Sequence, residues 1–116
     1  MNKGTVVFDF DGVIHSYTSG WKGVTIIPDP PVMGMKEVID DLKSAGYEVV
    51  VVSTRAAYAS GKIAIKKYLE DNQIQVDSIT NEKPPALVYV DDRAICFDGH
   101  AETLVDKIKN FKPWNK

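Results

Sequence analysis

Two acidic residues and a glycine follow the first apolar run of the chain. Residues 5–8 are all β-branched or aromatic, and Asp9, Asp11 and Gly12 come next, with Phe10 between the acids. This pattern indicates a central parallel strand, and ligands of open α/β sheets bind beyond the carboxyl ends of such strands. Two carboxylates there could hold a cation if the chain twists as it leaves the sheet, which Gly12 permits. The alternative is a strand followed by an ordinary Asp-Gly turn.

Polar residues recur at three later points along the expected strands and turns. Taken alone, each has a simple structural explanation: a hydroxyl at the end of a strand, a solvated lysine in a turn, or aspartates that cap a helix. Their appearance in a fixed order favours one shared site instead. The residues are Ser53, Thr54 and Arg55 after residues 48–52, Lys83 before two prolines, and Asp91, Asp92 and Arg93 after residues 86–90.

Together with Asp9 and Asp11, these residues resemble the four motifs of the haloacid dehalogenase (HAD) superfamily of phosphatases. The resemblance extends from the first strand to Arg93. It implies that Asp9 is a nucleophile that forms an aspartyl-phosphate, and that Asp11 is the general acid and base. It also implies that Ser53 is the phosphate-binding hydroxyl and Lys83 the fixed cation beside the phosphate.

The expected cofactor is Mg²⁺, a hard cation that is held by carboxylates, carbonyls and the substrate phosphate. The resemblance assigns it to Asp9, to the carbonyl of Asp11, and to Asp91 or Asp92. The spacing leaves open which of these last two touches the metal and which acts through water or Lys83. Mn²⁺ would satisfy the same oxygen atoms.

Other polar residues near these motifs have alternative assignments or none. Thr54 would replace the neighbouring serine as phosphate ligand if the register shifts by one residue. Arg55 and Arg93 are candidates for binding a substrate anion, and a salt bridge to a nearby acid is an equal alternative. We assign no role to His15 and His100.

Strand-like and helix-like segments alternate along the chain. This alternation predicts an α/β fold in a single domain, residues 1–116: a three-layer sandwich with a Rossmann-like parallel sheet, helices on both faces and no cap domain, as in HAD-like proteins. Apolar residues at helical spacing predict a helix that begins near Met35 and ends at Gly46. Further elements are expected at residues 58–72 (helix), 76–79 (strand), 86–90 (strand) and 101–111 (helix).

The connection over residues 15–33 is long and contains two glycines and three prolines. Residues 21–27 could form one arm of a hairpin that leans over the site, and a surface loop with a buried Trp21 is the alternative. Neither this connection nor residues 53–83 has room for a cap domain. An uncapped site would admit a bulky substrate, such as a protein side chain or a polynucleotide end, unless a neighbouring subunit covers it.

Composition indicates the class of protein and its expected location. Charged residues make up 26% and hydrophobic residues 44%, as in ordinary soluble domains, and the net charge of -2 gives weak evidence against a large nucleic-acid surface. The single cysteine, Cys96, lies in an apolar stretch and is expected in the core. No leader or membrane-spanning run is visible, so we expect a cytoplasmic protein with no membrane partner.

The predicted function is that of a metal-dependent phosphohydrolase that cleaves a phosphate monoester through an aspartyl-phosphate. The motifs are also similar to the phosphatase part of polynucleotide kinase-phosphatases and to small hydrolases of bacteria and phages. This resemblance implies that the partner is a phosphorylated small molecule or polymer end. A nucleotide or nucleic-acid 3'-phosphate is one candidate. No phosphate-binding loop of a kinase is present. The alternatives are a catalytically silent module and a phospho-accepting module on the same fold. A receiver domain is disfavoured because Lys83 precedes the acidic pair.

Overall fold

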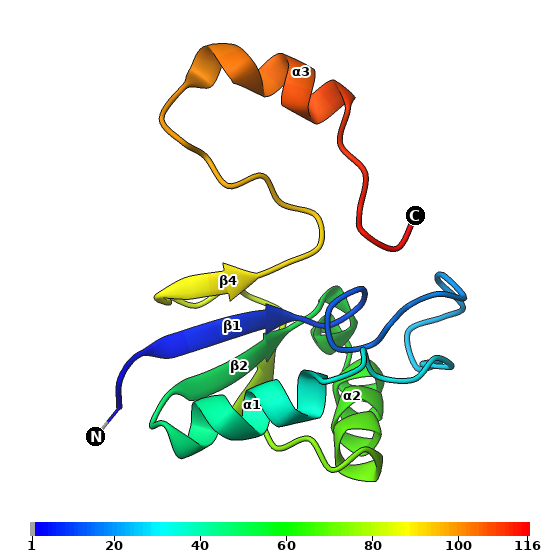
Figure 1. Ribbon diagram of the computed structural model, residues 1–116. Coiled ribbons are helices and arrows are strands. Elements are labelled where there is room, and N and C mark those ends of the chain that lie inside the picture. Colours follow the sequence, from blue (N-terminus) through cyan, green and yellow to red (C-terminus); the bar gives the residue numbers. More distant parts are fainter. Residues whose placement is uncertain (1) are drawn as a thin grey trace.

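The computed structural model describes residues 2–116. It shows one parallel β-sheet, on which the protein is built (Figure 1). The strand order is β3-β2-β1-β4, and all three pairings are parallel. The carboxyl ends of the strands therefore meet at one edge, as predicted. The strands are β1 (Thr5–Asp9), β2 (Glu48–Val52), β3 (Ser78–Thr80) and β4 (Val88–Val90).

Three α-helices and two short 3-10 helices join or follow these strands. The first helix ends at the predicted place, because Ala45 caps it and Gly46 follows with a left-handed φ of 99°. The predicted last helix is divided into a 3-10 turn and a short α-helix. Within residues 2–116, no helix has both the length and the apolarity to cross a membrane. The helices are α1 (Met35–Ser44), η1 (Thr54–Ala57), α2 (Ala59–Asp71), η2 (Ala101–Thr103) and α3 (Leu104–Lys109).

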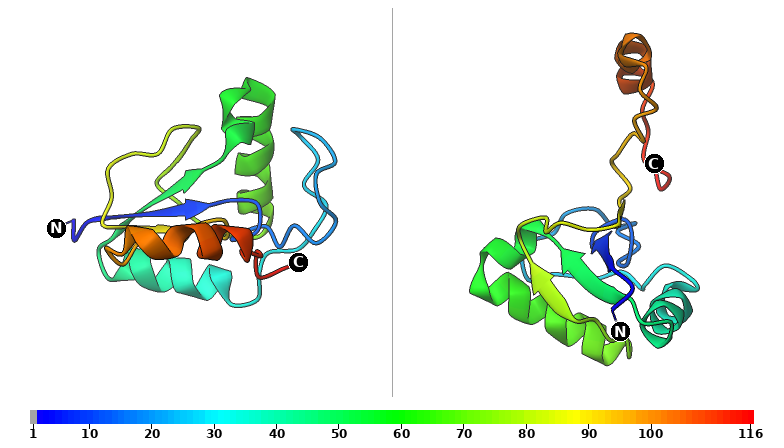
Figure 2. Two further views of the ribbon diagram at one scale, coloured as in Figure 1. Left: turned by 90° about the horizontal axis from the view of Figure 1, so that it is seen from above. Right: turned by 90° about the vertical axis from the view of Figure 1, so that its left-hand side faces the viewer.

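The main core lies between the sheet and helices α1 and α2. Phe8 of β1 pairs in register with Val51 of β2, and both are buried. Ile39 of α1 and Ile65 of α2 belong to the same buried cluster as these two residues. Both helices therefore cover one face of the sheet, as the right-hand view of Figure 2 shows. Right-handed crossovers explain this, because the chain moves outward in the same direction from β1 to β2 and from β2 to β3.

The opposite face has no helix against it among the described residues, which differs from the predicted three-layer sandwich. Val7 and Val50 point to this face and are nevertheless buried. Residues 81–87, which connect β3 to β4 without a helix, pass over it, and Pro84 and Pro85 line a hollow there together with Val50. The observed architecture is therefore a parallel sheet with two helices on one face and a loop on the other.

The chain after β4 stands away from the sheet. Residues 91–116, here called the C-terminal arm, carry α3 out beyond β4 and return toward the end of β1 (Figures 1 and 2). At its end, Trp114 Nε1 donates a hydrogen bond to the carbonyl oxygen of Gly12 (2.6 Å), and Asn115 Nδ2 donates one to that of Ser16 (3.2 Å). Cys96 is exposed on this arm, so the prediction that it lies in the core is wrong.

Candidate active site

Three carboxylates meet at the carboxyl edge of the sheet. Asp9 ends β1, and Asp91 and Asp92 follow β4, which pairs directly with β1. One carboxylate oxygen from each residue lies within 4.8 Å of those of the other two. Asp9 and Asp91, which are 82 positions apart in the sequence, are brought together because β4 pairs directly with β1. This edge is where the sequence predicted the acidic cluster.

The surroundings of Asp9 in this cluster disfavour its ionised form. Burial raises the pKa of Asp9 to about 7, and the hydrogen bond to Asp92 and the charge of Asp91 add to this effect. Asp92 Oδ1 is buried and has no hydrogen-bond partner among the described residues. Closely spaced carboxylate oxygens with an unpartnered member are suited to a hard divalent cation such as Mg²⁺ or Mn²⁺. The residues present therefore fit the predicted metal.

Gly12 forms the turn beside this cluster. Its φ of 85° is left-handed, which agrees with the predicted twist of the chain after β1. A Cβ atom at this position would collide with the carboxylate of Asp92. The absence of a side chain at Gly12 therefore makes room for one of the three carboxylates as well as permitting the turn.

Asp11 is not one of the three clustered carboxylates, and two other side chains hold it. Its Oδ1 is 2.8 Å from His15 Nδ1, and its Oδ2 accepts a hydrogen bond of 2.9 Å from Arg55 Nε. Burial by itself would raise the pKa of Asp11, but the hydrogen bonds from His15 and Arg55 outweigh it, and the pKa is lowered. Asp11 is thus an ionised acceptor with both oxygens occupied.

His15, to which we assigned no role from the sequence, is a buried part of this network, so that interpretation was wrong. The backbone N–H of Asp29 donates to His15 Nε2 at 3.1 Å. Because Nε2 accepts this bond, Nδ1 carries the proton that His15 donates to Asp11. No periodic pattern marks Asp29, and the only sequence signal was its position between two prolines in the long connection.

Arg55 is completely buried and joins the long connection to the site. One of its terminal nitrogens donates to the carbonyl oxygens of Gly23 (2.7 Å), Val24 (2.9 Å) and Ile26 (3.2 Å). The indole ring of Trp21 lies over the guanidinium at 4.5 Å. Of the two alternatives for Arg55, the structure shows the salt bridge, with Asp11 as the partner.

The long connection over residues 15–33 forms no hairpin. This differs from one of the two predictions for it, a hairpin arm at residues 21–27. Residues 21–27 contain a turn but no strand. Asp29 fixes the connection, because its carboxylate accepts hydrogen bonds from the N–H and the hydroxyl of Ser19, and its carbonyl oxygen accepts one from Tyr68 of α2. Trp21 is half exposed rather than buried. The connection is an ordered loop wrapped around Arg55.

The predicted phosphate-binding residues lie at the same edge of the sheet. Ser53 is buried and follows Val52, which pairs in register with Asp9. Its hydroxyl oxygen accepts a hydrogen bond of 3.1 Å from the N–H of Arg55, which leaves its O–H available to donate. Lys83 Nζ is 3.7 Å from Asp91 Oδ2, so it adjoins the acidic cluster.

The remaining candidates are less closely tied to the cluster. Thr54 is exposed at the start of η1. Arg93 contacts the site through its backbone, whose N–H donates to Asp91 Oδ1 at 2.8 Å. His100 lies on the C-terminal arm, 3.3 Å from Glu102, and is exposed.

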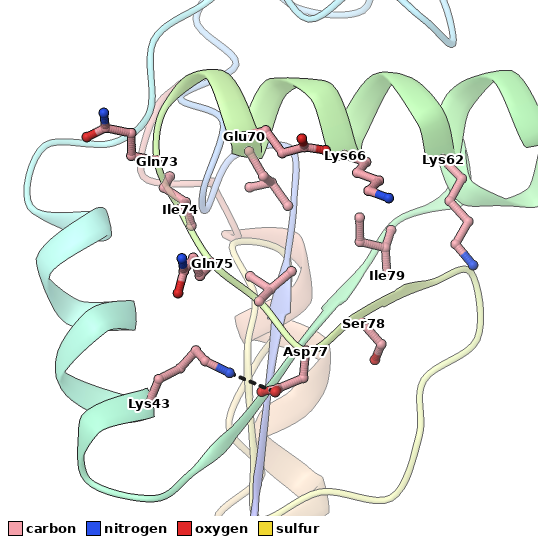
Figure 3. Close-up of a pocket in the computed structure, with 12 residues that line it drawn as sticks. Lys43, Lys62, Lys66, Glu70, Gln73, Ile74, Gln75, Asp77, Ser78 and Ile79 are labelled. Carbon is pink, nitrogen blue, oxygen red and sulfur yellow. Dashed lines mark hydrogen bonds and ion pairs between the residues drawn. The ribbon is translucent and has the colours of Figure 1, made fainter.

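A separate cavity of about 900 Å³ lies at the other side of the molecule, between α2 and β3 (Figure 3). Lys62 and Lys66 of α2 extend along it, and Asp77 at its base forms an ion pair of 2.7 Å with Lys43. None of the predicted site residues lines this cavity. The carboxylate cluster and the loop around Arg55 therefore remain the candidate active site.

Comparison with protein-family models finds no match for this chain, and comparison with curated proteins finds none either.

Proposed function

We propose that the protein is a metal-dependent phosphohydrolase that cleaves phosphate monoesters through an aspartyl-phosphate on Asp9. The observation that carries this proposal is the convergence of Asp9, Asp91 and Asp92 within 4.8 Å at the carboxyl edge of a parallel sheet. A buried hydroxyl, Ser53, follows the strand residue that pairs with Asp9, and a cation, Lys83, lies 3.7 Å from Asp91. Acidic, hydroxyl and cationic groups around one point are what phosphoryl transfer requires.

Asp9, together with Asp91 or Asp92, would hold the divalent cation. Asp92 is the better candidate of the two, because one of its oxygens is buried without a partner whereas Asp91 is engaged by Lys83 and by the N–H of Arg93. The cation, when bound, would neutralise charge on the phosphate and keep Asp9 ionised. The predicted contribution of the Asp11 carbonyl remains part of the proposal.

The chain's own residues would carry out two displacements. In the first, a carboxylate oxygen of Asp9 bonds to phosphorus while the bond to the leaving oxygen breaks. Asp11, which is ionised at rest, would first have to release one of its two hydrogen bonds and take up a proton from solvent before it could pass that proton to the leaving oxygen. In the second, water attacks the aspartyl-phosphate, Asp11 accepts a proton from it, and inorganic phosphate and free Asp9 are formed. Ser53 would donate a hydrogen bond to a phosphate oxygen, and Lys83 would balance its charge.

The hydrogen bonds of Asp11 favour a second candidate function. Both of its oxygens are occupied, by His15 and Arg55, so Asp11 must give up one of these bonds before it can exchange a proton with substrate or water. A site in which Asp11 kept both bonds would accept a phosphoryl group on Asp9 and release it slowly. A phospho-accepting regulatory module is therefore the alternative.

Hydrolysis of an aryl phosphate by the purified protein tests the first proposal. We expect turnover with Mg²⁺, little turnover with excess chelator, and a loss of at least about 10³-fold in kcat for Asp9→Asn, because the nucleophile is removed. Asp41→Asn, at an exposed position on α1, is the matched control and should retain full activity. Equal rates for Asp9→Asn and the control would exclude Asp9 as nucleophile.

A single-turnover experiment separates the two candidates. An acyl-phosphate donor such as acetyl phosphate is added with Mg²⁺, and phosphorylation of the protein is followed by mass spectrometry. One stable phosphoryl group per chain, absent in Asp9→Asn, without continued phosphate release would support the phospho-accepting module. Continued release would support the hydrolase, and 3'-phosphorylated oligonucleotides would then be included among the substrates tested.

A further inference from the structure

Exposed apolar side chains are concentrated in β4 and the C-terminal arm. Fifteen large hydrophobic residues among the described ones are exposed, and nine of them lie within residues 87–114, about a quarter of the chain. Scattered apolar residues on a surface are ordinary, but a concentration of this kind marks an interface. The nine are Leu87, Val88, Tyr89, Val90, Phe97, Val105, Ile108, Phe111 and Trp114.

The outer part of this surface is α3. Val105 and Ile108, three positions apart on the helix, are 61% and 62% exposed, and Phe111 follows them. No residue of α3 is buried, and the helix stands clear of the sheet in Figures 1 and 2. A helix of six residues does not form stably in water by itself, so its apolar side requires a partner surface.

The inner part is strand β4. Val88, Tyr89 and Val90 are all exposed, although they pair with Val6, Val7 and Phe8 of β1, which are all buried. Within residues 2–116, β4 pairs with β1 alone, so its other edge has no strand against it. An exposed apolar edge strand is a surface to which another chain binds unless it is covered.

The arm is held open by bonds at both of its ends. It begins at Asp91, directly after β4 is fixed to β1, and its other end is fixed by the hydrogen bonds from Trp114 and Asn115 to the turn after β1. The radius of gyration is consequently 14.9 Å. A compact chain of this length would have a value of about 13 Å. With these bonds in place, α3 does not cover the β4 of its own chain.

We propose that the protein forms a symmetric dimer in which α3 of each copy packs against β4 of the other copy. The part of the chain that the structure describes has an apolar helix, α3, with nothing packed on it and an apolar strand, β4, with exposed side chains, so two copies related by a two-fold axis would cover both of these surfaces. The nine exposed apolar residues of each copy within residues 87–114 would then be available to this contact.

The dimer would also support the candidate site, since the arm begins with Asp91 and Asp92 and ends with Trp114, which binds the carbonyl of Gly12. Packing of the arm against a second copy would restrict the residues at both of its ends. The proposal rests on exposure and topology alone and does not depend on the proposed phosphatase activity.

Sedimentation velocity of the full chain over a wide range of concentrations is the first test. We expect twice the mass of the chain, and we expect Val105→Asp and Ile108→Asp to raise the dimer dissociation constant at least tenfold. Ile63→Asp is the matched control, because Ile63 is as exposed but lies on α2. Since neither α3 residue is buried in one copy, both variants should keep the thermal stability of a folded monomer. A monomer at every concentration would overturn the proposal.

A cross-linking experiment then identifies which surfaces meet. Two variants are prepared in a Cys96→Ser background, one with Val88→Cys and the other with Ile108→Cys, and are mixed, diluted to exchange copies, and oxidised. A disulfide-linked pair containing one chain of each kind is the expected product. A chain with both substitutions that closes a disulfide only within itself, at concentrations where the mixture gives no pair, would show that α3 folds back on its own strand and would overturn the proposal.

Discussion

Gly12 is a residue of the site whose backbone conformation and surroundings both disfavour a side chain. It has a left-handed φ of 85°, and a Cβ atom there would collide with the carboxylate of Asp92. Gly20 has a similar φ of 74°, but a Cβ atom there would meet no atom within 4 Å. The two glycines share the cost of a left-handed backbone and differ in what surrounds them, which makes Gly20 an internal control for Gly12.

We expect Gly12→Ala to lower the free energy of unfolding by about 1 to 2 kcal/mol more than Gly20→Ala does. The shared part of the loss comes from backbone strain, and the additional part comes from displacement of Asp92. Urea unfolding of the two variants measures the difference. Gly12→Ala should also bind Mg²⁺ more weakly, as measured by calorimetry. Equal losses of stability for both variants would show that Asp92 moves aside without cost.

Among the structural elements, β3 is joined to its neighbours by Asp77, the residue just before it. Asp77 Oδ2 accepts a hydrogen bond of 2.7 Å from the N–H of Val49 in β2, and Oδ1 accepts one of 2.7 Å from Lys43 in α1. Burial by itself would raise the pKa of Asp77, but the bonds from Lys43 and Val49 outweigh it, and the pKa is lowered. One carboxylate therefore ties an edge strand to a helix and to the next strand.

We expect Asp77→Asn to reduce the free energy of unfolding by about 1 kcal/mol at pH 7. Because the folded pKa lies below that of the unfolded chain, the contribution of Asp77 is fully present above the unfolded value and is lost as the pH falls through the folded value. The variant and the parent should therefore converge in stability in acid. Asp71→Asn, in the exposed pair with Lys67, should change stability by less than about 0.5 kcal/mol. A difference from the parent that persists at low pH would exclude an ionic origin.

The sequence predicted elements best where hydrophobic periodicity was strong. The parallel sheet was predicted correctly from the apolar runs of β1 and β2 and from the helical spacing of apolar residues in α1 and α2. Because Asp9 and Asp91 lie at the carboxyl ends of predicted strands, their proximity was predicted as well. The hairpin, one of the two predictions for residues 21–27, does not form because buried Arg55 binds the carbonyl oxygens that a partner strand would have used. The role of His15 was missed for the same reason, since it depends on the path of a loop without periodicity.

At the scale of the whole molecule, the candidate metal site joins the first strand of the chain to the last. Asp9 belongs to β1, and Asp92 follows β4. Three carboxylates near one another repel, and the raised pKa of Asp9 reflects burial together with this proximity. A cation that binds the folded state alone would remove the repulsion and hold the two strands together.

We expect Mg²⁺ to raise the melting temperature relative to a sample with chelator. A concentration of 100 times the dissociation constant corresponds to about 2.7 kcal/mol of added stability. Asp92→Asn should lose most of this increase, while Asp41→Asn should keep it. Differential scanning calorimetry in matched buffers provides the measurement. The same melting temperature with Mg²⁺ and with chelator would argue against a metal site at these carboxylates.

The strand order β3-β2-β1-β4 also has a consequence for how the protein assembles. The unit from β1 to β3 consists of strands and helices that are neighbours in the sequence, so we expect it to form early. β4 must then dock against β1 across a long separation in the chain, and Asp91 and Asp92 arrive only with it. We therefore expect the three-carboxylate cluster to be completed only after this unit has formed, so that a partly folded chain would have Asp9 in place without the other two carboxylates.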